Sequence, residues 1–238
     1  MKTLPLERLL RQLDNAAREA GRPVPRLLAV CKRQPATAVA ELARQWRGIL
    51  EGQDERVPAF GENYVQEAQA RQAELSGSGF AVSELEWHLI GHLQSNKAKE
   101  AAMRFDWIQT VDRLRLVDAL ARARPPERGV LNVLVQVNVD DETSKHGCTP
   151  EGIHTLATAI AAQPRLALRG LMAIPAPHPE LARRRDAFAR MKALFDDLRT
   201  THPHIDTLSM GMSDDFALAI AEGATMVRVG TALFGPRQ

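Results

Sequence analysis

The chain has few cysteines and few aromatic side chains for its length. Its 238 residues include two cysteines, one tyrosine and three tryptophans. The two cysteines lie in unrelated contexts and form neither a disulfide framework nor a metal-ligand spacing. We therefore expect no bound metal and a reducing, cytoplasmic location.

Long apolar runs and an excess of one charge are also missing. No segment approaches the ~18 consecutive apolar residues that a membrane span needs. The N-terminal residues carry charges throughout and lack the apolar centre of a signal peptide. With 31 Lys and Arg against 29 Asp and Glu, the net charge is +2. This balance argues against nucleic acid and an anionic membrane as partners.

Helix-type and strand-type patterns alternate along the chain, with about eight predicted strands. Residues 132–139 (NVLVQVNV) are the clearest strand, and no break in composition marks a second domain. The alternation predicts an α/β fold, with residues 1–238 forming a single (β/α)8 barrel of the TIM type. A doubly wound open sheet is the alternative. It would carry a Gly-rich fingerprint after its first strand, and residues 29–35 (AVCKRQP) contain none.

Several helices can be placed from the pattern. One additional N-terminal helix precedes the first strand, and we expect it to cover one end of the barrel. Its apolar face is formed by Leu6, Leu9, Leu10, Leu13 and Ala17. Later helices are predicted to stop at Gly48, to start at Asp112 as N-cap, and to span Asp214–Glu222.

The most informative segment is the first predicted strand, Leu27–Cys31, which runs directly into Lys32. Active sites of such barrels lie at the C-terminal ends of the strands. Lysine shifts its pKa readily on burial and is the usual Schiff-base residue. The alternative is a lysine at a strand edge with its ammonium group in water. Asn63 and His88 stand at or near the ends of the next two strands.

The loops after the last two strands contain residues suited to an anion. Barrels commonly hold phosphate there. Gly211 and Gly230 allow close approach of the backbone, and Ser213 and Thr231 offer hydroxyl groups. Each loop alone could be a tight turn with a helix cap. Together with Lys32 on the opposite side, the loops indicate a phosphorylated carbonyl ligand held as an imine.

Long segments in the chain resemble the pyridoxal phosphate homeostasis proteins. The segments are AVCKRQP (29–35), FGENYVQE (60–67), WHLIGHLQSNK (87–97), FDWIQTVD (105–112), LMAIPAP (171–177), HIDTLSMGMSDDF (204–216) and MVRVGTALFG (226–235). The resemblance implies a barrel related to the N-terminal domain of alanine racemase, with pyridoxal 5′-phosphate (PLP) held by Lys32 as a Schiff base. It also implies that Ser213, Gly230 and Thr231 bind the phosphate and that Arg228 faces the pyridine nitrogen.

Other residues are less well placed by the sequence. We expect Asn63 and His88 to bind the cofactor as well, although His88 on an apolar strand also fits a core histidine. Whether Tyr64 or Lys145 contacts the ligand stays open. The loop Ile49–Pro58 is longer than expected for the resemblance and could alter ligand exchange.

Two functions of different classes follow. The first is a non-enzymatic PLP carrier acting in homeostasis and transfer to PLP-dependent enzymes. The second is a PLP-dependent enzyme resembling an amino-acid racemase. Racemisation needs two bases, and the sequence offers no obvious second base, so we expect no catalytic residue. A class I aldolase using Lys32 is not supported by the resemblance. We expect the carrier to be a monomer.

Overall fold

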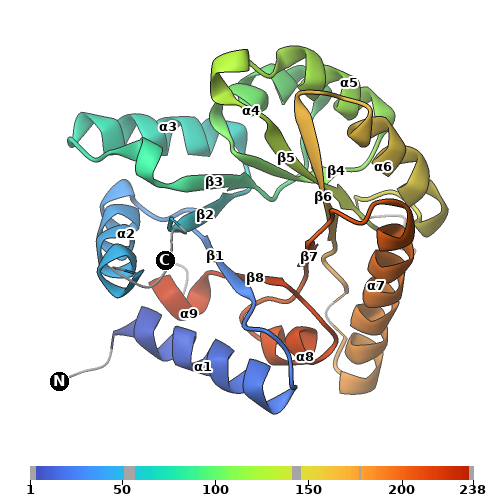
Figure 1. Cartoon of the computed structure of the whole chain (residues 1–238). Helices are drawn as coiled ribbons and strands as arrows, with labels where there is room; N and C mark the ends of the chain where they lie inside the picture. The colour runs from blue at the N-terminus through green and yellow to red at the C-terminus, as the bar shows by residue number, and fades with distance from the viewer. Residues whose placement is uncertain (1–3, 51–56, 141–145, 177, 236–238) are drawn as a thin grey trace.

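The computed structural model describes residues 4–50, 57–140, 146–176 and 178–235, in which eight parallel strands close into a barrel (Figure 1). Each strand pairs with the next one in the chain, and β8 pairs with β1, so the sheet has no open edge. The strands are β1 (Arg26–Val30), β2 (Ala59–Glu62), β3 (Glu86–Leu89), β4 (Trp107–Val111), β5 (Leu131–Gln136), β6 (Leu166–Met172), β7 (Thr207–Ser209) and β8 (Met226–Val229).

Helices alternate with the strands and surround the barrel, which confirms the predicted (β/α)8 fold with an N-terminal helix. The helices are α1 (Pro5–Glu19), α2 (Ala36–Leu50), α3 (Val65–Gly77), α4 (Ala98–Arg104), α5 (Leu114–Ala123), α6 (Ile153–Ala161), α7 (Leu181–Thr201), α8 (Phe216–Ala221) and α9 (Thr231–Phe234). Four 3-10 turns lie in the connections, at η1 (Val82–Glu84), η2 (Ser95–Lys97), η3 (Pro126–Arg128) and η4 (Pro150–Gly152).

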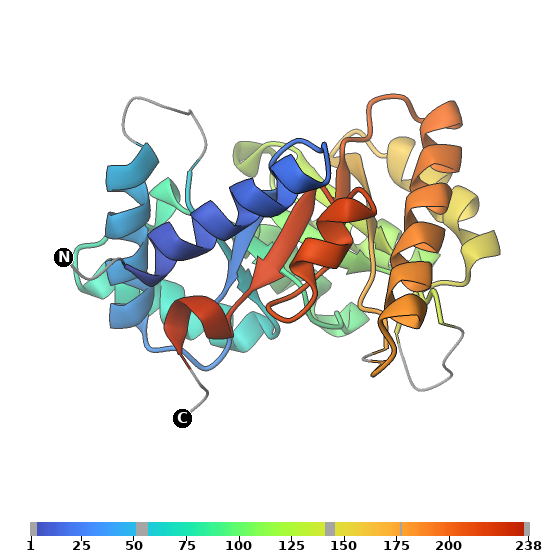
Figure 2. The ribbon, with the colours of Figure 1, turned by 90° about the horizontal axis from the view of Figure 1, so that it is seen from below.

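Helix α1 takes a different place from the one expected. It lies in the outer ring beside α2, α8 and α9, and does not cover an end of the barrel (Figures 1 and 2). The helix that follows β8, α9, has only 4 residues and is too short to shield β8 and β1. Helix α1 fills that position, with the predicted apolar face turned inward; its buried residues are Leu6, Leu9, Leu13 and Ala17.

Two helix boundaries also differ from the sequence prediction. Helix α2 continues through Gly48 to Leu50, so the helix-weakening effect of glycine is outweighed there. Helix α8 begins at Phe216 and not at Asp214. The preceding turn is held by the carboxylate of Asp215, which accepts a hydrogen bond from the N–H of Met212 at 2.6 Å.

Asp112 does not cap the helix that follows β4. Arg113 is the residue before α5, and no side chain caps the helix N-terminus. The carboxylate of Asp112 instead pairs with the guanidinium of Arg113 at 2.5 Å.

Side chains on each strand alternate between the outside and the inside of the barrel. Ala29 on β1 and Cys31 just after it pack in the large apolar layer between strands and helices, whereas Leu28 and Val30 pack together inside the barrel. The same alternation turns Lys32 inward at the C-terminal end of β1. The fold therefore brings the lysine to the mouth of the barrel.

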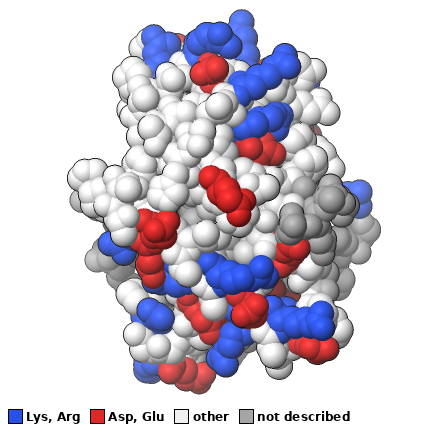
Figure 3. Space-filling model, turned by 90° about the vertical axis from the view of Figure 1, so that its right-hand side faces the viewer, with Lys and Arg blue, Asp and Glu red and all other residues white. Residues whose placement is uncertain are grey.

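The surface around α7 carries charges of both signs, intermixed (Figure 3). Arg183 pairs with Glu180 at 3.3 Å, and Arg185 pairs with Glu222 at 2.9 Å. This face therefore presents no extended field of one sign. None of the helices in the described part of the chain is long and apolar enough to cross a membrane.

Candidate functional site

Lys32 stands in a tight turn directly after β1. The backbone N–H of Gln34 donates to the carbonyl of Cys31 at 3.0 Å, which closes the turn. Arg33 adopts a φ of 60°, a conformation that costs a non-glycine residue about 1 kcal/mol or more. Pairing with β2 reaches this turn, since the N–H of Cys31 donates to the carbonyl of Gly61 at 3.0 Å. A strained turn fixed to the sheet thus presents the lysine.

A cavity of about 170 Å³ lies at the mouth of the barrel, where the strand ends meet. Its lining comes from residues that follow or end β1, β2, β3, β6, β7 and β8. These residues are Val30, Lys32, Gln34, Asn63, Ile90, Ile174, Met212, Arg228, Gly230, Thr231 and Gly235. Five residues expected from the sequence thus meet at one cavity, namely Lys32, Asn63, Arg228, Gly230 and Thr231.

Arg228 on β8 places a buried cation at this cavity. The residue is 3% exposed, and its guanidinium donates to Ser209 Oγ and to the carbonyl of Ala173, both at 2.8 Å. Burial lowers the pKa of Arg228 to about 10, with Asp215 opposing the shift. The side chain therefore stays charged at neutral pH. Both hydrogen-bond acceptors are neutral, so the cation can attract electron-rich atoms of a ligand.

Gly230 and Thr231 form the adjoining wall. A Cβ atom added at Gly230 would lie 3.0 Å from the carbonyl oxygen of Val30, so even alanine would be tight there. Thr231 is exposed and carries the hydroxyl that the sequence predicted for an anion. A glycine with close backbone approach, next to a hydroxyl, suits a small anionic group.

Ser213 lies in the β7–α8 loop at the same end of the barrel but does not line the cavity. Its neighbour Met212 does. The loop is shaped by Gly211, which has a φ of 91° and whose added Cβ would lie 2.5 Å from that of Ala219. Ser213 is partly buried beside the wall.

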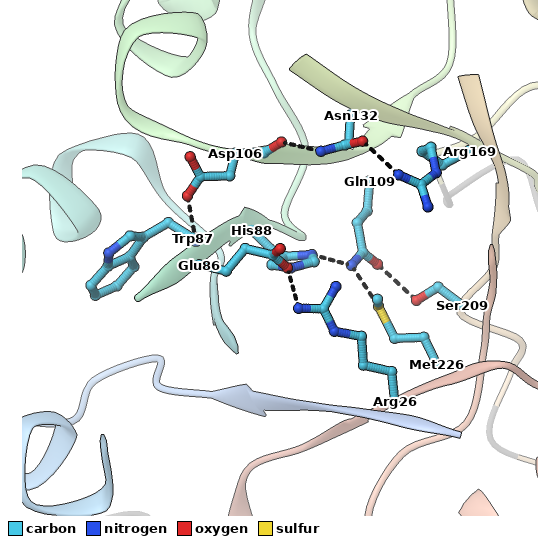
Figure 4. Close-up of polar contacts among 10 residues, drawn as sticks. All are labelled: Arg26, Glu86, Trp87, His88, Asp106, Gln109, Asn132, Arg169, Ser209 and Met226. Carbon is cyan, nitrogen blue, oxygen red and sulfur yellow. Dashed lines mark hydrogen bonds and ion pairs between the residues drawn. The ribbon is translucent and has the colours of Figure 1, made fainter. Parts of the chain in front are cut away.

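His88 lies deeper, inside the barrel, and does not line the cavity. It is fully buried and stacks on Trp107, with ring centroids 5.1 Å apart. One ring nitrogen contacts Glu86, and the other lies 2.9 Å from Gln109 Nε2 (Figure 4). Burial lowers the pKa of His88, although Glu86 opposes the shift. These surroundings are those of a buried core histidine.

His88 belongs to a chain of polar contacts that runs through the barrel interior to Arg228. At one end, Arg26 pairs with Glu86 at 2.7 Å. Beyond His88, Gln109 accepts a hydrogen bond from Ser209 Oγ at 2.7 Å (Figure 4), and Ser209 accepts a bond from Arg228. The sequence analysis missed Gln109 and Ser209. Each lies in a strand that carries two polar residues, Gln109 with Thr110 on β4 and Ser209 with Thr207 on β7, so the local pattern did not single it out.

On the outer side of β1 and β2, Cys31 takes part in a second buried network. Its thiol donates to Glu62 Oε1 at 3.1 Å, and Glu62 also pairs with Arg71. Burial raises the pKa of Cys31 well above its usual range, and the charge of Glu62 adds to the shift. The thiol is therefore not a nucleophile, in agreement with a packing role opposite Lys32.

Tyr64 approaches Lys32 from a neighbouring cavity. Lys32 Nζ lies 5.6 Å from the centroid of the tyrosine ring. Tyr64 lines that second cavity, together with Asn63, and not the cavity at Lys32. Lys145 and residues 51–56 of the Ile49–Pro58 loop lie outside the described residues.

The described lining of the Lys32 cavity has a simple composition. Apart from Lys32 and Arg228, every lining residue is apolar, glycine, amide or threonine. Arginine keeps its proton at neutral pH. Among the described residues that line this cavity, Lys32 is thus the one group able to give and take a proton; Tyr64 lies outside the lining, although its ring is 5.6 Å from Lys32 Nζ.

Comparison with known proteins gives matches along nearly the whole chain. The family model of the alanine racemase N-terminal domain matches residues 4–238. A pyridoxal phosphate homeostasis protein of Escherichia coli K12 is 51% identical over 211 residues, which cover 89% of this chain and 85% of that protein.

Solved structures agree with the sequence matches. PipY of Synechococcus elongatus PCC7942, a structure without PLP, has a TM-score of 0.80 at 36% identity and covers 97% of this chain and 98% of its own. The structure of PipY with PLP bound has a TM-score of 0.74 at 35% identity, covering 95% and 100%. An alanine racemase of Clostridium difficile shares the fold, with a TM-score of 0.62 at 18% identity, covering 96% of this chain but 56% of its own.

The polar chain below the cavity predicts a pH dependence of stability. Burial raises the pKa of Glu86, but contacts with His88 and Arg26 outweigh it and lower the pKa to about 2. Unfolding restores a value near 4.5. The resulting stabilisation, about 3 kcal/mol, is fully present above pH ~4.5 and is lost as the pH falls toward ~2. Urea unfolding between pH 6 and 2.5 measures it.

The matched variants are Glu86→Gln and, as a control at an exposed position, Glu127→Gln. Glu86→Gln should be less stable at pH 6 and should lose stability less steeply in acid than the unmodified protein. Glu127→Gln should follow the unmodified protein. Parallel pH curves for Glu86→Gln and the unmodified protein would contradict the assignment.

Proposed function

The chain belongs to the pyridoxal phosphate homeostasis protein family, and on that basis we propose that it binds PLP as a Schiff base on Lys32. We propose further that it acts in intracellular PLP homeostasis and transfer, as a carrier and not as an enzyme. The observation that carries this proposal is the composition of the Lys32 cavity. Its described lining combines one lysine and one buried cation with no second group that could move a proton.

The described residues fit the groups of PLP one by one. When bound, PLP supplies an aldehyde for an amine and a ring that can act as an electron sink. Lys32 provides the amine from its turn after β1. Arg228 holds a fixed positive charge at the cavity, where it disfavours a proton on the pyridine nitrogen. A ring without that proton is a weaker electron sink, which suits binding more than catalysis.

The phosphate is assigned to the wall formed by the ends of β7 and β8. Gly230 leaves space that a Cβ would fill, and Thr231 offers a hydroxyl. Ser213 lies next to the lining residue Met212 and can reach the same anion after a small rearrangement of its loop. Asn63, which lines the cavity, is proposed to contact the ring. His88, which does not line the cavity, is proposed to act on the cofactor through the polar chain to Arg228.

The alternative, a racemase-like enzyme, needs a second base on the opposite face of the substrate. The chain's one tyrosine, Tyr64, faces a different cavity and is 52% exposed. The alanine racemase match covers 56% of that enzyme's chain, and a likeness at 18% identity concerns the fold alone. The carrier is therefore favoured.

The remaining expectations are part of the same proposal. The recipients are PLP-dependent enzymes, which would take the cofactor from Lys32 by exchange of one amine for another. Both cysteines are free thiols, which suits a reducing cytoplasmic compartment. The barrel is proposed to act as a monomer, and as one domain because its eight strands close into a single sheet.

Replacement of Lys32 tests the Schiff base. Lys32→Ala should abolish the visible absorbance of the PLP-bound protein and the adduct trapped by borohydride, because the amine that forms the linkage is gone. The melting temperature should change little, since the side chain is partly exposed. Absorbance spectra during titration with PLP measure the effect.

Lys97→Ala is the matched control, because Lys97 lines the neighbouring cavity, where it pairs with Glu100 at 3.2 Å. It should keep the absorbance. A visible band retained in Lys32→Ala, or lost in Lys97→Ala, would contradict the assignment.

Replacement of the two hydroxyl residues tests the phosphate site. Ser213→Ala with Thr231→Ala removes two donors to a dianion, each worth about 1.5–3 kcal/mol. The affinity for PLP should fall by roughly tenfold or more, while pyridoxal without phosphate should bind almost as before. Fluorescence titration with both ligands distinguishes the outcomes. Equal affinity for PLP in the variant and the unmodified protein would place the phosphate elsewhere.

A further inference from the structure

Two histidines and an aspartate meet beside the second cavity, which has a volume of about 560 Å³. His92 and His146 both line this cavity. Asp112 completes the cluster, with its Oδ2 atom 3.8 Å from His92 Nδ1. One possible ligand atom from each residue lies within 4.8 Å of the other two. The cluster is separate from the Lys32 cavity, whose described lining includes none of the three.

The first two members are held in place by the residues around β4. Thr110 Oγ1 donates to the carbonyl of the residue before His92, and Arg113 donates to the carbonyl of the residue after it, both at 2.8 Å. Arg113 also pairs with Asp112 Oδ1 at 2.5 Å. One arginine therefore positions the histidine segment and the carboxylate together, and the other carboxylate oxygen is directed at His92.

His146 reaches the cluster from the connection after β5. Gln136 Nε2 donates to the carbonyl of His146 at 3.2 Å and so anchors its backbone. The imidazole rings of His92 and His146 stack, with centroids 3.6 Å apart and an angle of 15° between the planes. Each ring offers a nitrogen that can bind a metal when that nitrogen carries no proton.

We propose that His92, Asp112 and His146 form a site for a divalent late transition metal ion, with Zn²⁺ the best match. Two imidazole nitrogens and one carboxylate oxygen are the donor set of open zinc sites, in which water or a small anion takes the fourth position. Here the fourth position faces the second cavity.

Metal binding requires the two imidazole rings to leave their stacked arrangement, so that a nitrogen of each can point at one ion. Donors around a tetrahedral Zn²⁺ lie about 3.3 Å apart when the bonds are about 2.0–2.1 Å long. The present separations therefore close by about 1.5 Å at most, through rotation of two exposed histidine side chains. The cations nearby are already paired, Arg113 with Asp112 and Lys97 with Glu100, so neither opposes the ion with an uncompensated charge.

The sequence led us to expect no metal, because its two cysteines show no metal-ligand spacing along the chain. These ligands come instead from three separate connections, after β3, β4 and β5, which the barrel brings together. The site also adjoins the Lys32 cavity. A Cβ added at Gly91, the residue before His92, would lie 2.1 Å from the carbonyl oxygen of Asn63.

Metal titration tests the site directly. Full-length protein, purified without a histidine tag and without PLP, is titrated with ZnCl₂ by calorimetry and with CoCl₂ by visible absorption. We expect one equivalent of Zn²⁺ and the absorption bands of four- or five-coordinate Co²⁺. His92→Ala, His146→Ala and Asp112→Asn should each weaken Zn²⁺ binding by roughly tenfold or more, and the double histidine variant should abolish it.

His154→Ala is the control, because it removes an exposed imidazole that pairs with Asp197 on the helix layer. It should bind Zn²⁺ as the unmodified protein does. Circular dichroism and melting curves confirm that each variant is folded. No binding by the unmodified protein, or binding that survives the double variant, would overturn the proposal.

Discussion

A guanidinium buried inside the barrel, that of Arg228, sets the conditions for the rest of the structure. Moving a cation out of water is costly unless its donors are satisfied. Here the acceptors are Ser209 Oγ and the carbonyl of Ala173. Ser209 in turn requires Gln109, and the contacts continue through His88 to the pair of Glu86 and Arg26. The barrel interior is polar along this chain of contacts because the buried guanidinium at the mouth needs hydrogen-bond acceptors, which need partners of their own.

The cation and the lysine together explain the chemistry that we assign to the cavity. Lys32 is inward because β1 alternates, and it is lifted to the mouth by a turn with a positive φ at Arg33. Arg228 supplies charge without exchanging a proton at neutral pH. A cavity with one proton-exchanging group can form and release a linkage to an aldehyde. Among the described lining residues there is no second group of the kind that a racemisation would need.

The sequence was sufficient for the barrel and for most of the cavity, since both depend on local pattern. Lys32 and Thr231 directly follow predicted strands, Gly230 ends the last predicted strand, and parallel strands end on the same side. The sequence pattern does not predict which side chains of distant strands contact one another. Nothing local shows that Gln109 meets Ser209, or that His92 meets His146. The position of α1 in the outer ring was also missed. This position depends on the length of α9, which has only 4 residues and is too short to cover β8 and β1.

We propose above all that this cavity binds PLP without turning over amino acids. The most direct test is exchange of the Cα proton of L-alanine in deuterated water, followed by NMR with PLP-loaded protein and, in parallel, with free PLP at the same concentration. The PLP-loaded protein should give no exchange and no D-alanine above the level of free PLP. Sustained exchange with formation of D-alanine, lost in Lys32→Ala, would contradict the carrier and identify an enzyme.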